Sequence, residues 1–317
     1  MKKIGFAVRA CAIILALAIG MTGCPGRGET IRFATGGLAG TYFPFGTAIA
    51  AVLGEELRMN IIVSSTGASM ANIQQMQAGI VEMALVQNDV MDYAWRGVYL
   101  FEGGQYQGFR TMAAMYPEVC QVVALPGINS ISELRGMRVA VGDEGSGTEF
   151  NARQILAAHD ITFDDIIVHH MGFAASAIAL QHGVLDAAFV TSGAPTPAIT
   201  SLALTQDITI LGVEPAAAAR LMEAYPFYTL YTIPAGTYAG VNNDVLTVAV
   251  KATLIVSERL SEDTVYRMTR ALFEHRDAIA LGHARGHDID LEYAVQGVTV
   301  PFHPGAARFF RAMGVMQ

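Results

Sequence analysis

Three loops rich in glycine and hydroxyl side chains are the strongest candidates for chemistry in this sequence. Each loop follows a short β-branched run and precedes a helical pattern, so each ends at a predicted helix start. Unpaired backbone N–H groups at a helix start attract negative charge, and glycine lets the backbone approach a ligand closely. The candidate residues are Thr35, Gly36, Gly40, Thr41 and Tyr42 in the first loop, Thr66, Gly67, Ala68 and Ser69 in the second, and Ser146, Gly147 and Thr148 in the third.

Taken singly, each loop is better explained as an ordinary glycine-rich turn in which a Ser or Thr caps a helix. Three loops of one design, two in the first half of the chain and one in the second, favour a shared anion site where the halves meet. Two further strand ends carry polar residues, at the position where open α/β sheets bind ligands. These are Gln87 with Asp89, and Thr191 with Ser192. Asp89 is equally well explained as a cap of the following helix.

Motifs for catalysis, nucleotide binding and metal binding are incomplete. No glycine loop continues into Gly-Lys-Ser/Thr, and no Gly-x-Ser-x-Gly elbow occurs. His283 and His287 have a spacing that can bind metal on a helix, but the glycines around them predict a loop. His169 and His170 are adjacent on a predicted strand and point to opposite faces. We therefore expect no enzyme activity, no cofactor and no metal site.

The elements that must position the loops alternate between short extended runs and helical stretches, which predicts an α/β fold. The length of 317 residues is typical of two domains. A content of 52% hydrophobic and 15% charged residues excludes intrinsic disorder. The formal net charge of −8 argues against broad nucleic-acid binding, which requires neutralised phosphates.

Long extended runs suggest where the chain passes between two lobes. Two such runs flank Pro117, and a β-rich run at 245–256 precedes a predicted helix at 262–280. We expect the last third of the chain to return to the first half. The prediction is a discontinuous first lobe, residues 30–115 and 232–317, and a second lobe, residues 116–231.

Residues 1–23 predict an export signal peptide. The basic start, with Lys2 and Lys3, precedes an apolar stretch that is shorter than the roughly 20 residues needed to span a bilayer. The residues before Cys24 resemble a bacterial lipobox, which makes Cys24 a candidate for lipidation and membrane-surface anchoring. We expect a periplasmic or extracytoplasmic protein. Beyond that segment the sequence contains only Cys120, so no disulfide is expected.

A series of short segments, in this order, resembles the TAXI family of extracytoplasmic solute-binding proteins, which deliver ligands to TRAP transporters. The resemblance covers residues from about Ile31 to Gly314. Its segments include Ala34-Thr35-Gly36-Gly37, Gly40-Thr41-Tyr42, Thr66-Gly67-Ala68-Ser69, Leu85-Val86-Gln87-Asn88-Asp89, Gly145-Ser146-Gly147-Thr148, Gly183-Val184-Leu185-Asp186-Ala187 and His303-Pro304-Gly305-Ala306.

The resemblance implies a two-lobed, type II-like periplasmic-binding-protein fold with crossing hinge strands and a ligand cleft between the lobes. It implies closure over a small carboxylate such as glutamate or 2-oxoglutarate, and TRAP membrane subunits as partners. By position, the binding loops of the family fall on Thr35, Gly40, Thr41 and Tyr42, on residues 66–69, on Gln87 and Asp89, and on residues 146–148. Two alternatives stay open: a receptor that feeds a sensor kinase, and an enzyme on the same scaffold.

Overall fold

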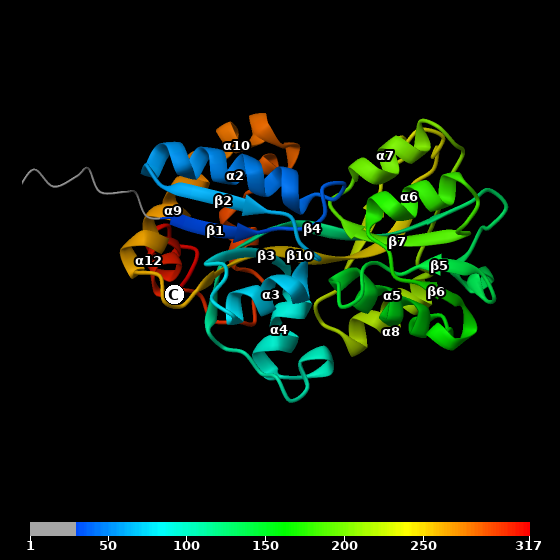
Figure 1. Ribbon diagram of the computed structural model, residues 1–317, viewed down its shortest axis with the longest axis horizontal. Helices are drawn as coiled ribbons and strands as arrows, with labels where there is room; N and C mark the ends of the chain where they lie inside the picture. The colour runs from blue at the N-terminus through cyan, green and yellow to red at the C-terminus, as the bar shows by residue number, and fades with distance from the viewer. Residues whose placement is uncertain (1–29) are drawn as a thin grey trace, which may run out of the picture.

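The computed structural model describes residues 30–317 as two lobes connected by long strands (Figure 1). The predicted signal peptide at residues 1–23 and the candidate lipidation site Cys24 lie outside the described residues. No helix within the described range has the length and apolar character needed to cross a membrane.

The first lobe is built on the parallel strands β1 (Thr30–Ala34), β2 (Asn60–Ser64) and β3 (Met83–Gln87), with β1 in the middle. Every residue of β3 is buried, which is expected for a parallel strand covered by helices on both faces. The helical segments of this lobe are α2 (Tyr42–Leu57), α3 (Ser69–Gln77), α4 (Asn88–Arg96), η1 (Tyr99–Phe101), α9 (Glu262–Glu274), α10 (Arg276–Gly282), η4 (Ala284–Asp288), α11 (Leu291–Val295) and α12 (Pro304–Ala312).

The second lobe repeats this design with the parallel strands β5 (Arg138–Ala140), β6 (Ile167–His169) and β7 (Ala187–Ser192), again with the first of the three in the middle. Two more strands, β8 (Thr209–Leu211) and β9 (Thr229–Ile233), pair with the crossing strands described next. The helical segments are η2 (Ile131–Leu134), α5 (Gly147–Ala158), η3 (Phe163–Asp165), α6 (Phe173–Gln181), α7 (Pro197–Ala203) and α8 (Pro215–Ala224).

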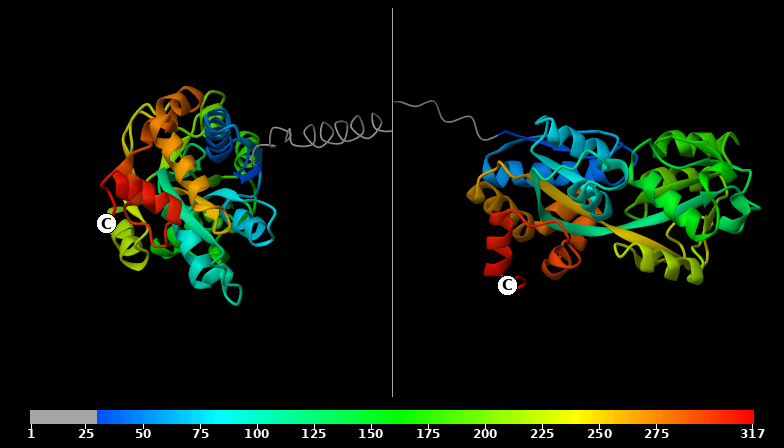
Figure 2. Two further views of the ribbon diagram at one scale, coloured as in Figure 1. Left: turned by 90° about the vertical axis from the view of Figure 1, so that its left-hand side faces the viewer. Right: turned by 90° about the horizontal axis from the view of Figure 1, so that it is seen from below.

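Two long antiparallel strands, β4 (Phe109–Ala124) and β10 (Val245–Ser257), belong to both lobes (Figure 2). The first part of β4 pairs with β10, and its last part pairs with β7 and β8. Likewise, β10 pairs with β9 at its start and with β3 at its end. The predicted two-lobed α/β fold with crossing strands is therefore confirmed, while the exact lobe boundaries stay a prediction.

Pro117 does not separate two strands, as the sequence suggested, but lies inside β4. It is opposite Lys251 of β10, and β7 joins the other edge of β4 only from Val119 onward. A proline cannot donate a backbone hydrogen bond. A sheet therefore tolerates it at this position, where one edge of β4 has no partner strand until β7 begins to pair at Val119.

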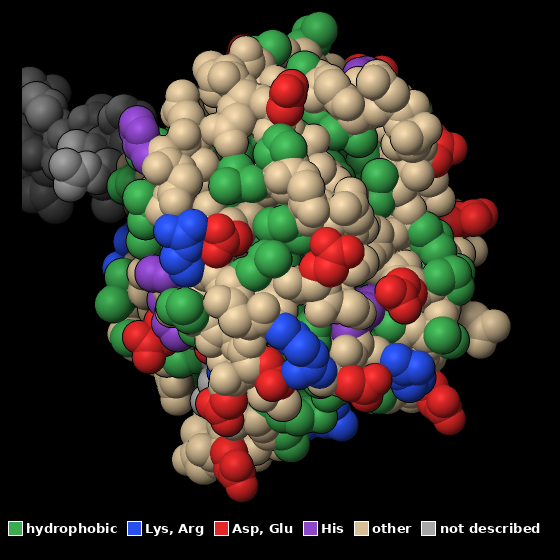
Figure 3. Space-filling view, turned by 90° about the vertical axis from the view of Figure 1, so that its right-hand side faces the viewer, with side chains coloured by type: hydrophobic (Ala, Val, Ile, Leu, Met, Phe, Trp, Pro, Cys, Tyr) green, Lys and Arg blue, Asp and Glu red, His purple; other side chains and the backbone are tan. Residues whose placement is uncertain are grey.

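One continuous sheet runs through both lobes, and in each lobe helices cover both of its faces (Figure 1). In the first lobe α2 and α10 lie on one face and α3 and α4 on the other, and in the second lobe α6 and α7 lie opposite α5 and α8. One core cluster extends under α3 and α4 and continues under α5 and α8, so the two lobes share apolar packing. Figure 3 shows the end formed by the second lobe, where acidic and basic side chains are interspersed.

The predicted helix at 262–280 is divided into α9 and α10 at His275, whose φ of −110° and ψ of 24° leave the helical range. No Gly or Pro marks this break in the sequence. The bend brings the end of α10 against α2, where a Cβ added to Gly282 would lie 2.8 Å from the Ala48 Cβ.

Candidate ligand-binding cleft

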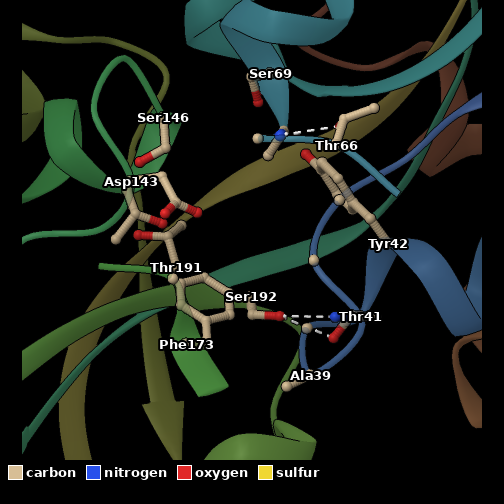
Figure 4. A pocket seen from close by; sticks show the side chains of 18 of the residues that line it. Ala39, Thr41, Tyr42, Thr66, Ser69, Asp143, Ser146, Phe173, Thr191 and Ser192 are labelled. Carbon is tan, nitrogen blue, oxygen red and sulfur yellow. Dashed lines mark hydrogen bonds between the residues drawn. The ribbon is translucent and has the colours of Figure 1, made fainter. Parts of the chain in front are cut away.

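A cavity of about 340 Å³ lies between the two lobes. Two loops of the first lobe and two of the second form its walls, and Gln87 and Glu118 from strands also line it. Figure 4 shows Tyr42, Thr66 and Ser69 on one side, across from Asp143, Ser146 and Thr191. The predicted site residues that line the cavity are Gly36, Gly40, Thr41, Tyr42, Thr66, Gly67, Ala68, Ser69, Gln87, Ser146, Gly147, Thr148, Thr191 and Ser192.

Four helices begin at this cavity: α2 at Tyr42, α3 at Ser69, α5 at Gly147 and α6 at Phe173. The first residue of each helix lines the cavity. Only α5 has a side-chain cap, since the Ser146 hydroxyl accepts a hydrogen bond from the N–H of Glu149 at 3.2 Å. The other three starts have no side-chain cap, which leaves backbone N–H groups able to bind an anion.

The lobes are in direct contact beside the cavity, so the structure represents a closed arrangement. The Thr41 hydroxyl lies 2.9 Å from the Ser192 hydroxyl, and the Thr41 N–H donates to the same oxygen at 3.2 Å (Figure 4). The Ala198 N–H donates to the Ala39 carbonyl at 3.2 Å, and Arg285 donates to the Ala194 carbonyl at 2.7 Å. Backbone groups, the hydroxyls of Thr41 and Ser192, and the Arg285 guanidinium therefore make these contacts between the lobes.

Glu118 is a buried carboxyl group of the cavity wall. The Tyr42 hydroxyl donates a hydrogen bond to its Oε2 at 2.7 Å, and only 2% of the residue is exposed. Burial raises the pKa of Glu118 to about 8, helped by the nearby Asp89 carboxyl, while the bond from Tyr42 opposes this shift. The Glu118 side chain is therefore largely uncharged at neutral pH.

Two predicted site residues do not line the cavity. Thr35 is fully buried, and its hydroxyl donates to the Ser64 carbonyl at 2.7 Å, which ties β1 to β2. Asp89 is also fully buried and accepts a hydrogen bond from Asn151 of the second lobe at 3.1 Å. Burial, as the largest cause, raises the pKa of Asp89 to about 7. The structure thus gives both residues roles in packing between strands or lobes.

Several lining residues were not identified from the sequence, including Glu118, Asp143 and Phe173. Glu118 lies within an otherwise apolar strand, and Phe173 reads as part of an apolar helix, so neither has a local signal for binding. Asp143 lies three positions before Ser146, at the beginning of the third loop. Asn72 supports the site from behind, because its side-chain amide donates to the carbonyls of Thr35 and Leu85.

The histidine pair lies apart from the cavity lining. His283 precedes η4, where its Nδ1 accepts from the Arg285 N–H at 3.2 Å, and His287 lies within η4. Across residues 30–317, no group of three or more His, Cys, Asp or Glu side chains is placed to hold a metal ion.

A family model described as the NMT1-like family matches residues 33–314 of the chain. Solved structures share the fold at low sequence identity. PhnD1 from Prochlorococcus marinus, solved with methylphosphonate, has a TM-score of 0.56 and 8% identity, over 91% of this chain and 99% of that one. The alkanesulfonate-binding protein SsuA from Xanthomonas axonopodis, bound to MOPS, has a TM-score of 0.52 and 12% identity, over 91% and 92%.

A third structure, a binding protein component of an ABC phosphonate transporter from Pseudomonas aeruginosa, has a TM-score of 0.51 and 11% identity, over 81% of this chain and 79% of that one. At these identities the likeness is one of fold. The chain has the two-lobed fold of periplasmic binding proteins, with the cavity in the position of the cleft between the lobes.

Proposed function

The chain belongs to the NMT1-like family, and from this premise we propose that it is an extracytoplasmic solute-binding protein that captures a small carboxylate for a membrane transporter. The single observation that carries the proposal is the convergence of four helix starts on one cavity between the lobes. Each helix start carries about half a positive charge, so together they favour an anionic head group.

The ligand is held mainly by backbone N–H groups and hydroxyls. The loops at 66–69 and 146–148 belong to different lobes, so a ligand that contacts both stabilises the closed arrangement. A ligand shifts the equilibrium between open and closed states only by its extra contacts in the closed state. The hydrogen bond between the Thr41 and Ser192 hydroxyls stabilises the closed state even without the ligand.

The proposed mechanism is capture without chemical change. The ligand enters the open cleft, the lobes rotate about β4 and β10, and closure excludes water from the cavity. Closure also creates a surface made from both lobes, which membrane subunits can distinguish from the open form. Release then requires only reopening at the transporter.

The partner and location are proposed at two levels. The coarser level is a membrane transporter as the partner of an exported protein. Residues 1–23 act as the signal peptide, and Cys24 is the candidate for lipid anchoring. The finer level is a TRAP-type carrier, which rests on the sequence motifs. The neighbour from an ABC phosphonate transporter shares the fold alone. Uptake assays with the protein and either class of membrane subunit decide between the two partners.

The ligand class is tested with purified protein by native mass spectrometry, followed by release and identification of any bound small molecule under denaturing conditions. A panel of carboxylates, with sulfonates and phosphonates as comparison, is then tested for a rise in melting temperature. An intact carboxylate at one per protein supports the proposal. An empty protein whose melting temperature ignores every carboxylate contradicts it, and recovery of a chemically altered compound indicates an enzyme.

A further inference from the structure

Charge is unevenly distributed in the cavity. Among the described residues that line it there are two carboxyl groups, Glu118 and Asp143, and no Lys, Arg or His. Asp143 is exposed, whereas Glu118 is buried. The four helix starts supply only partial positive charges. A second full negative charge on a ligand would therefore lack a cationic partner, and an unpaired charge inside a protein is costly.

Among the carboxyl groups that line the cavity, Glu118 would interact most strongly with a charge on the ligand, because it is buried. Its Oε2 accepts the hydrogen bond from Tyr42 at 2.7 Å. Because Glu118 lines the cavity, a ligand in the cavity lies close to this carboxyl group. An interaction there takes place with little water to screen it.

The groups that face Glu118 from the neighbouring elements offer no cation. They are Tyr42 of α2, Asp89 of α4, Tyr116 and Cys120 of β4, and Tyr293 of α11. The nearest candidate cation on β10, Lys251, is engaged elsewhere, because its ammonium group donates to the Gln296 carbonyl at 2.7 Å and lies 4.0 Å from the centre of the Tyr293 ring.

We infer that the cavity selects acids with no more than one net negative charge, because no cation lines it, and that Glu118 makes this limit stricter when its carboxyl group is ionised. The inference deepens the proposed function and rests on it. With its carboxyl group uncharged, Glu118 tolerates one carboxylate held by the helix starts. A second carboxylate meets no counter-charge, whereas a ligand ammonium group beside Glu118 offsets the second charge and is accepted.

The test uses two pairs of acids that differ in charge on one carbon skeleton. Glutarate is compared with its monoamide glutaramate, and 2-oxoglutarate with glutamate, by isothermal titration calorimetry at pH 7. The member with less negative charge is expected to bind about tenfold more tightly or better. A larger ratio for the glutamate pair than for the glutaramate pair places the ammonium group at Glu118.

The variant Glu118→Gln keeps the size of the side chain and removes its charge at every pH. In it, the ratios at pH 7 are expected to persist, because Glu118 is already largely uncharged there, whereas any decrease in glutaramate affinity between pH 7 and pH 9 is expected to disappear. Glu223→Gln, on the exposed face of α8, is the matched control and should keep the pH dependence of the unaltered protein. A decrease that persists in Glu118→Gln overturns the inference.

A pH series on the unaltered protein gives a second readout that does not depend on folding of the variant. Because the pKa of Glu118 is raised to about 8, affinity for glutaramate is expected to decrease as pH rises from 7 to 9. A flat profile, or dianions that bind as tightly as their partners, overturns the inference while leaving carboxylate capture intact. If none of the four acids, nor any other carboxylate, binds, the proposed function itself is overturned.

Discussion

Replacing Asp89 by Asn is expected to stabilise the folded protein at neutral and alkaline pH and to leave its stability unchanged in acid. Asp89 is fully buried at the start of α4. Its Oδ2 accepts from Asn151, and no described residue hydrogen-bonds its Oδ1. Burial raises the pKa of Asp89 from 3.8 to about 7, and hydrogen bonds from Val90 and Asn151 only partly oppose this rise.

The sign of the effect follows from proton binding in the two states. The folded protein keeps the Asp89 proton up to a pH of about 7, whereas the unfolded chain loses it near pH 4. Between these values the folded state binds more protons, so the free energy of unfolding falls as pH rises. The gap of about three pH units corresponds to at most ~4 kcal/mol, lost in full above about pH 7. An Asn side chain does not ionise, so the variant keeps this part of the free energy of unfolding as pH rises.

Urea denaturation followed by far-ultraviolet circular dichroism, at pH 4, 6 and 8, measures the free energy of unfolding of both proteins. The gain of Asp89→Asn should be about 2 to 4 kcal/mol at pH 8 and close to zero at pH 4. Asp277→Asn is the matched control, because that side chain is 94% exposed and should show no pH-dependent gain. A variant that is equally or less stable at pH 8, or that gains the same amount at every pH, refutes the reasoning.

Three further predictions concern the cleft. Changing Ser146 and Thr148 together to Ala should weaken binding of the released ligand in calorimetry, and an unchanged affinity would remove that loop from the site. Gly147→Ala should hinder closure, because the added Cβ would overlap the Gln87 amide in the other lobe. Small-angle scattering with ligand should then resemble the open form, and adding Gln87→Ala should restore compaction. Ser192→Ala removes the two cross-lobe hydrogen bonds between Thr41 and the Ser192 hydroxyl and should raise Kd about fivefold or more; a Kd equal to that of the unaltered protein would show that these bonds contribute nothing to closure.

The loops of the cleft were predictable because their signals are local. A β-branched run, a Gly-rich turn and a helix start follow one another within about ten residues around Gly40, Gly67 and Gly147. Parallel strands in one sheet then bring such turns to one edge. Thr35 and Asp89 carry the same local sequence pattern as their neighbours, yet both side chains are buried away from the cavity. The sequence pattern does not reveal this, because the surroundings of a side chain depend on which elements pack around it.

Glu118 had no such signal. It follows a proline within a run of apolar residues, and nothing in its sequence neighbours distinguishes it from a half-buried strand residue. Its role arises because α2 places Tyr42 beside it, 76 positions earlier in the chain. The division of the predicted helix at His275 is a similar case, since no Gly or Pro marks the break in the sequence.

The sequence by itself determined the α/β class, the two halves and the three turns that end at helix starts, because hydrophobic period, glycine and helix caps act over a few neighbouring residues. Only the tertiary structure decided how β4 and β10 pair across both lobes and which buried carboxyl groups face the cavity. These outcomes depend on contacts between residues far apart in the chain, and burial, which sets the charge of Glu118 and Asp89, exists only once those contacts have formed.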